Sequence, residues 1–171
     1  TIQHVVNAAV NTLYNCAQET LVDGMARERQ QYSGDGSHQL HAVIQTLGDI
    51  TLPYRFVNTF SQGLSIDGYF MDSWPAWDRL ARTVERQMHL TGWGPILDHS
   101  IGFCFDAFHY YMYTGDLQGL KEVYPRLLSF FSYLYKLTDK SEHLVPVENL
   151  GMCSVYIDHE AYKQTKHKQL A

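Results

Sequence analysis

Residues 101–134 are the most regular stretch of the sequence and read IGFCFDAFHYYMYTGDLQGLKEVYPRLLSFFSYL. On both sides of the turn Thr114-Gly115-Asp116, apolar residues recur every three or four positions, which is the spacing of one helix face. Gly115 suits the end of a helix, and Asp116 can cap the start of the next. The stretch therefore predicts an antiparallel helix pair, with Pro125 expected to kink or split the second helix.

The same apolar spacing continues over most of the chain and predicts further helices around residues 2–13, 40–47, 57–64 and 77–88. Ser37 is the expected N-cap of the second of these helices and Gly48 its C-terminal stop. The third and fourth are expected to begin near Pro53 and Pro75. Only Val155–Ile157 reads as a candidate strand. We therefore expect an all-α fold of antiparallel helix pairs in a single domain, residues 1–171.

The amino-acid composition favours a globular protein and argues against nucleic-acid-binding and membrane-spanning classes. Hydrophobic residues make up 45% and charged residues 18%, which is typical of a globular chain. The net charge of -5 and the lack of a basic cluster argue against a nucleic-acid partner. No apolar run approaches the ~18 residues that span a bilayer, so no membrane partner is expected. The compartment stays open, with a periplasmic or extracellular parent protein as one option.

Cysteines and histidines do not predict a metal site. Cys16, Cys104 and Cys153 are far apart and lie beside apolar residues, which favours buried free thiols over disulfides or zinc ligands. His38 and His41 lie three apart on one expected helix, but the sequence shows no evident third ligand. We therefore expect no metal and no cofactor.

Residues 23–36 read DGMARERQQYSGDG and combine three acids, Asp23, Glu28 and Asp35, with Arg27 and Arg29. Neighbouring acids raise a carboxyl pKa and arginines lower it. Such a cluster can keep one acid protonated near neutral pH while the others stay ionised, as protonation of a leaving group requires. A network of arginines and carboxylates that only pins the loop explains the composition equally well.

This string closely resembles the signature of the α-L-rhamnosidase family of six-hairpin glycosidases, Asp-Cys-Pro-Gln-Arg-Glu-Arg followed by Gly-Trp-Thr-Gly-Asp. The matching positions, without a gap, are Asp23, Arg27, Glu28, Arg29, Gly34 and Asp35. The resemblance implies that Glu28 is the general acid, that Asp23 and Asp35 hold sugar hydroxyls or tune Glu28, and that Arg27 orders the site. We count Asp35 with Glu28 as catalytic.

Two further segments extend the resemblance. Residues 97–100 and 110–116 are similar to Pro-Asp-Phe-Ser and Tyr-Tyr-x-Tyr-Thr-Gly-Asp of the family, which implies that Asp98 faces the sugar. Residues 155–159 are similar to a segment ending Phe-Ile-Asp-Trp, which implies the same for Asp158. Tyr32 stands where the family has a stacking tryptophan and is counted as substrate-binding, with Asp23 and Arg27. Trp93, on a loop between two glycines, is a further candidate for stacking on a sugar.

The resemblance implies that the helix pairs form part of an (α/α)6 toroid and that the protein is an inverting glycoside hydrolase. Its expected partner is a carbohydrate with a terminal α-linked deoxyhexose such as rhamnose. The alternative is a non-catalytic helical carbohydrate-binding or scaffold module. The chain starts and stops inside expected helices, at Thr1 and in residues 160–171, which indicates a piece of a longer protein. No segment matches the family's general base, so we expect these residues alone to be inactive and to self-associate through uncovered helix faces.

Overall fold

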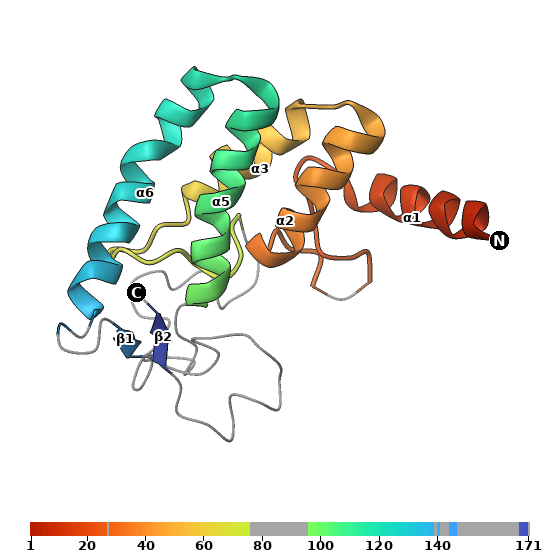
Figure 1. Cartoon of the computed structure of the whole chain (residues 1–171). Helices are drawn as coiled ribbons and strands as arrows, with labels where there is room; N and C mark the ends of the chain where they lie inside the picture. The colour runs from red at the N-terminus through yellow and green to blue at the C-terminus, as the bar shows by residue number, and fades with distance from the viewer. Residues whose placement is uncertain (27, 76–95, 139, 141–143, 147–167, 171) are drawn as a thin grey trace.

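The computed structural model describes residues 1–26, 28–75, 96–138, 140, 144–146 and 168–170, and in these the chain is predominantly helical (Figure 1). The predicted all-α class is thereby confirmed. The helix expected around residues 77–88 and the candidate strand Val155–Ile157 lie outside the described residues. Closure of the helix pairs into a toroid stays a prediction.

The described helices are α1 (Ile2–Cys16), α2 (Ser33–Ala42), the π-helical turn η1 (Val43–Leu47), α3 (Thr51–Ser61), α5 (Leu97–Thr114) and α6 (Leu117–Leu137). Two short strands, β1 (Leu144–Pro146) and β2 (Lys168–Leu170), pair antiparallel with Val145 opposite Gln169. The expectation that residues 160–171 open a further helix is therefore wrong for residues 168–170. Among the described residues, no helix has both the length and the apolar character needed to cross a membrane.

The α5–α6 hairpin forms as the sequence predicted. Gly115 ends α5 in the left-handed region at φ 68°, a conformation that glycine adopts without steric cost. Asp116 then caps α6, because its Oδ1 accepts a hydrogen bond from the backbone N–H of Gly119 at 2.9 Å. The Tyr110 hydroxyl donates to the other carboxylate oxygen at 2.7 Å. One aspartate thus links the last turns of α5 to the first turn of α6.

One local expectation is wrong, and of the two outcomes expected at Pro125 the split is wrong. Helix α2 begins at Ser33, so Ser37 lies inside the helix and is not its N-cap. Helix α6 runs through Pro125 as one helix of 21 residues and is not split. Pro125 is exposed, so solvent can satisfy the carbonyl group that loses its amide partner.

The core is a cluster of phenylalanine rings at which α3, α5 and α6 meet. Its fully buried members are Phe56, Phe60, Phe70, Phe103 and Phe130. The Phe103 ring lies 4.7 Å from that of Phe60 and 5.1 Å from that of Phe70, centroid to centroid. Edge-to-face and tilted contacts at such distances are favourable beyond the area that they bury. Helix α5, which carries Phe103, packs against α2, α3 and α6 and is the central helix of the described chain.

Several apolar faces stay exposed. Helix α1 extends away from the other helices, and its Ile2 and Val5 are 85% and 70% exposed (Figure 1). The outer sides of α5 and α6 expose further large side chains, among them Phe105, Phe108 and Phe131. Apolar surface gathered in this way is typical of an interface. Self-association through these faces stays a prediction.

The cysteines agree with the expectation of free thiols in the part of the chain that is described. Cys16 is buried and Cys104 half-buried, and neither forms a disulfide. Burial raises the pKa of Cys104 to about 12, so this thiol is protonated and unreactive at neutral pH. Cys153 lies outside the described residues.

The ring cluster leads to a test of the core. We expect Phe103→Ala to lower the free energy of unfolding by about 3–5 kcal/mol, because it removes the central ring and leaves a cavity. Phe105→Ala is the matched control, since Phe105 lies on the same helix but is 60% exposed, and its effect should stay within about 0.5 kcal/mol. Urea unfolding followed by circular dichroism measures both. Similar losses in the two variants would contradict this assignment of the core.

Candidate functional site

The acid loop, residues 23–35, is closed at its base by two hydrogen bonds between Asp23 and Gln30. The backbone N–H of Asp23 donates to the Gln30 carbonyl at 2.9 Å, and the N–H of Gln30 donates to Oδ1 of Asp23 at 2.8 Å. Glu28, which lies between these two residues in the sequence, is beside Asp23. Arg29, in the same loop, has a φ of 54°. This lies in the left-handed region of backbone conformation, which costs energy for a residue other than glycine.

The three acids of the loop lie close enough to interact. Burial raises the pKa of Asp23, the backbone hydrogen bond from Gln30 opposes the rise, and a side-chain hydrogen bond with Glu28 raises the pKa further. The negative charges of Glu28 and Asp35 add to this rise. A carboxyl group can donate a hydrogen bond to a neighbouring carboxylate only while it is protonated, so the contact with Glu28 favours the protonated form of Asp23. The Asp23–Glu28 pair therefore retains a proton to higher pH than an isolated carboxyl group does.

A second loop, residues 65–75, holds the acid loop in place. Tyr32 and Ser73 form an isolated antiparallel bridge. The Ser73 hydroxyl donates to Oε1 of Gln30 at 3.0 Å, and the buried Gln31 side chain donates to the Trp74 carbonyl at 2.6 Å. The acid loop and the second loop thus lie together, a pairing that the sequence did not show.

The start of α5 packs against the end of the acid loop. A Cβ atom added at Gly34 would lie 2.8 Å from Cε1 of the His99 ring, so only a glycine fits there without displacing that ring. Asp98 lies in the first turn of α5, directly before His99, and is half-buried. The segment that carries Asp98 is therefore beside the acid loop, as a shared site requires.

Not every predicted site residue can be placed. The structure brings Asp23, Glu28 and Asp35 together, pairs the backbone of Tyr32 with the second loop, and sets the Asp98 segment alongside. Arg27, Trp93 and Asp158 lie outside the described residues. Sequence reasoning missed Gln30, Gln31 and Ser73, which shape the loop. The apolar spacing of the sequence gives no signal for them, because polar side chains that anchor loops follow no periodic pattern.

Sequence reasoning also missed a group of side chains that could hold a metal ion. His41 of α2 lies beside Asp106 and His109 of α5, and one potential ligand atom from each lies within 4.8 Å of the others. Burial raises the pKa of Asp106 to about 7, and the hydrogen bond from Ser37 opposes the rise. His38, the neighbour that the sequence suggested, is exposed and is not a member of this group.

Comparison of the chain with protein-family models, with curated proteins and with solved structures found no match.

The shared hydrogen bond leads to a test by pH. A carboxyl group whose pKa is raised on folding stabilises the folded state below its ordinary pKa, and that stability is lost as the pH rises through the raised value. Asp23→Asn keeps an acceptor for the Gln30 amide and removes the charge. Its melting temperature should therefore match the wild type near pH 4 and exceed it at pH 7.

The exposed Asp67→Asn, on the second loop, is the control and should show no such change between the two pH values. Thermal melts of wild type and both variants give the comparison. If Asp23→Asn were instead less stable at pH 7, the Asp23 carboxylate would be held by a cation, and the alternative of an arginine–carboxylate network would be correct.

Proposed function

We propose that this chain carries the acid side of the active site of an inverting glycoside hydrolase that acts on terminal α-linked deoxyhexoses such as rhamnose. The observation that carries the proposal is the side-chain hydrogen bond between Asp23 and Glu28, with the charge of Asp35 close by. A proton shared by two carboxyl groups suits general-acid catalysis, whereas glycoside hydrolysis with inversion is what the resemblance implies. The sugar class rests on the resemblance of residues 23–36 to the rhamnosidase signature.

The leaving-group oxygen of a glycoside departs as an alcohol only if an acid protonates it as the bond breaks. A carboxyl group in water is ionised at pH 7 and holds no proton to give. The raised pKa of Asp23 favours a proton on the Asp23–Glu28 pair, and in the proposed role Glu28 delivers that proton to the leaving group while Asp23 is the partner that keeps it on the pair. The negative charge of Asp35 would also favour the positive charge that develops on the sugar ring.

Accessibility and rigidity both suit this role. Glu28 is half-buried and Asp35 exposed, so a sugar could reach both side chains. The backbone on either side of Glu28 is held at Asp23 and Gln30, which limits the movement of the acid. An inverting mechanism also needs a second carboxylate about 6.5–9.5 Å from the acid, on the other face of the sugar.

The competing function is a non-catalytic carbohydrate-binding or scaffold module. It requires no proton donor, so Asp23 and Glu28 would act only as acceptors for sugar hydroxyls. The two functions predict different effects of the leaving group on turnover. Loss of a catalytic acid lowers turnover more when the leaving group is poor, and loss of a side chain that only binds the sugar does not.

The test is Glu28→Gln, made in the complete protein. With an alkyl or sugar leaving group, turnover of an α-L-rhamnoside should fall by ~10²–10⁴, the usual contribution of general-acid catalysis. With a nitrophenyl leaving group, which needs little protonation, the loss should be much smaller. Proton NMR of the first product should show the β-anomer, as inversion requires.

Glu19→Gln is the matched control, because Glu19 is an exposed glutamate in the same connection between α1 and α2. It should leave both substrates unaffected. Equal losses on both substrates in Glu28→Gln would assign Glu28 to binding or structure. Rhamnoside binding without turnover by the wild type would favour the module.

A further inference from the structure

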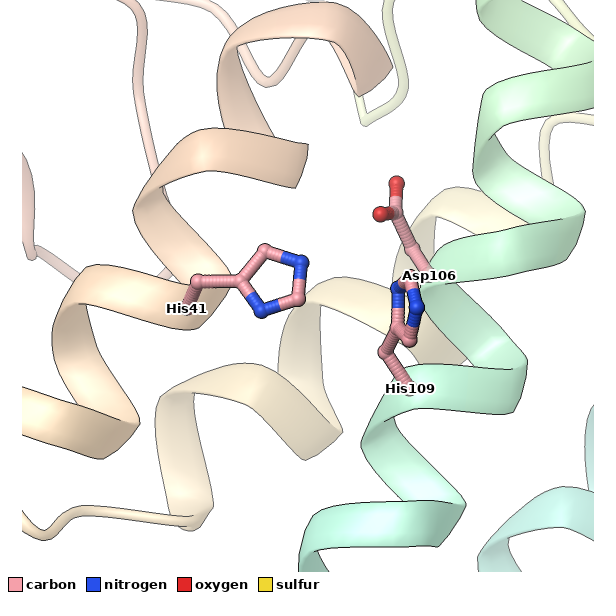
Figure 2. A group of neighbouring side chains, drawn as sticks. All are labelled: His41, Asp106 and His109. Carbon is pink, nitrogen blue, oxygen red and sulfur yellow. The ribbon is translucent and has the colours of Figure 1, made fainter.

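His41, Asp106 and His109 meet between α2 and α5, at a place that the proposed glycosidase chemistry does not use. Figure 2 shows His41 extending from α2 toward α5, where Asp106 and His109 lie one turn apart. Residues three apart on a helix share a face, so Asp106 and His109 both reach the side that α2 covers. The His41 and His109 rings lie 4.9 Å apart, centroid to centroid, at an interplanar angle of 62°.

Two atoms of this group are buried without a hydrogen-bond partner among the described residues. Asp106 is only 1% exposed, and its Oδ1 accepts from the Ser37 hydroxyl at 2.7 Å, but its Oδ2 has no partner. Nδ1 of His109 has none either. Buried polar atoms are nearly always paired, so an unpaired carboxylate oxygen and an unpaired imidazole nitrogen in one group of side chains call for a further partner. A cation would satisfy both.

The third side chain, His41, is oriented as a metal ligand usually is. Its Nδ1 lies 3.1 Å from the Tyr113 hydroxyl, which also accepts a hydrogen bond from Gln45 at 3.0 Å. If Nδ1 carries the proton and donates it to Tyr113, the lone pair of Nε2 is left for a metal. Metal-bound histidines typically donate their other ring N–H in this way, which fixes both the tautomer and the direction of the ring.

We propose that His41, Asp106 and His109 bind a divalent transition-metal ion, with zinc as the best fit. Two imidazole nitrogens and one carboxylate oxygen suit zinc and its neighbours, whereas magnesium and calcium prefer oxygen ligands. The ligand atoms of a tetrahedral zinc ion lie about 3.3 Å apart. The observed separations, all within 4.8 Å, reach that value with small side-chain rotations. Three protein ligands leave one position for water or another small ligand.

The ion would join α2 to α5 directly. His41 lies six residues after Asp35, or about 9 Å further along the axis of α2. A metal at this point would therefore fix the helix whose first turn carries an acid of the proposed active site. The metal proposal does not depend on the glycosidase proposal, because none of its ligands belongs to the acid loop.

The test uses the 171-residue chain without a histidine tag, treated with a chelator and titrated calorimetrically with zinc chloride. We expect one zinc ion per chain, a higher melting temperature with zinc, and a visible absorption band when cobalt replaces zinc. Magnesium and calcium should not compete. His41→Ala, His109→Ala and Asp106→Asn should each weaken zinc binding at least about tenfold, and Tyr113→Phe by about 10–100-fold.

His38→Ala is the matched control, because His38 is an exposed histidine three residues before His41 on the same helix, and it should bind zinc as the wild type does. Circular dichroism checks that each variant is folded, and Asp106→Asn keeps the volume of the buried side chain if the alanine variants unfold. The absence of saturable zinc binding would overturn the proposal. So would binding that survives in folded Asp106→Asn, or that His38→Ala removes.

Discussion

The close approach of the start of α2 to α3 and α5 is the contact on which the rest of the described structure depends. A Cβ atom added at Gly36 would collide with the Phe56 ring of the core, and one added at Gly34 would press on the His99 ring of α5. Two glycines lower the helix propensity of this turn. The packing that they permit outweighs this cost and sets the position of the acid loop directly before α2.

From that contact, the two ends of α2 face two different groups of polar side chains. Its first turn carries Asp35 beside Asp23 and Glu28, at a surface that a sugar can reach. Further along, Ser37 donates to Asp106 and His41 lies beside His109, on a side that α5 covers. The first group is acidic and partly exposed, which suits transient binding and proton transfer. The second is half-buried or buried, and Oδ2 of Asp106 and Nδ1 of His109 lack hydrogen-bond partners among the described residues, which suits a resident ion.

The acid loop also illustrates how a polar loop can keep a defined shape without secondary structure. Two hydrogen bonds between Asp23 and Gln30 close the base of the loop. Two more bonds join it to the second loop, because the Gln31 side chain donates to the Trp74 carbonyl and the Ser73 hydroxyl donates to the Gln30 side chain. The positive φ of Arg29 is tolerated within this frame. A carboxyl pair can share a proton only while its two side chains stay adjacent, so the anchoring of the loop is a condition for the chemistry proposed for it.

For the described helices, the sequence by itself determined that they form, the stops at Gly48 and Gly115 and the cap at Asp116, because these depend on apolar spacing and on the backbone preferences of adjacent residues. It also singled out the three acids as a group. Tertiary structure decided that α2 begins at Ser33, where Tyr32 is held against Ser73, and that Ser37 bonds to α5 and does not cap its own helix. It also brought His41 to Asp106 and His109, which no spacing in the sequence connects. Contacts of this kind depend on which faces of two helices pack together. The packing of the whole core sets those faces, and residues adjacent in the sequence do not.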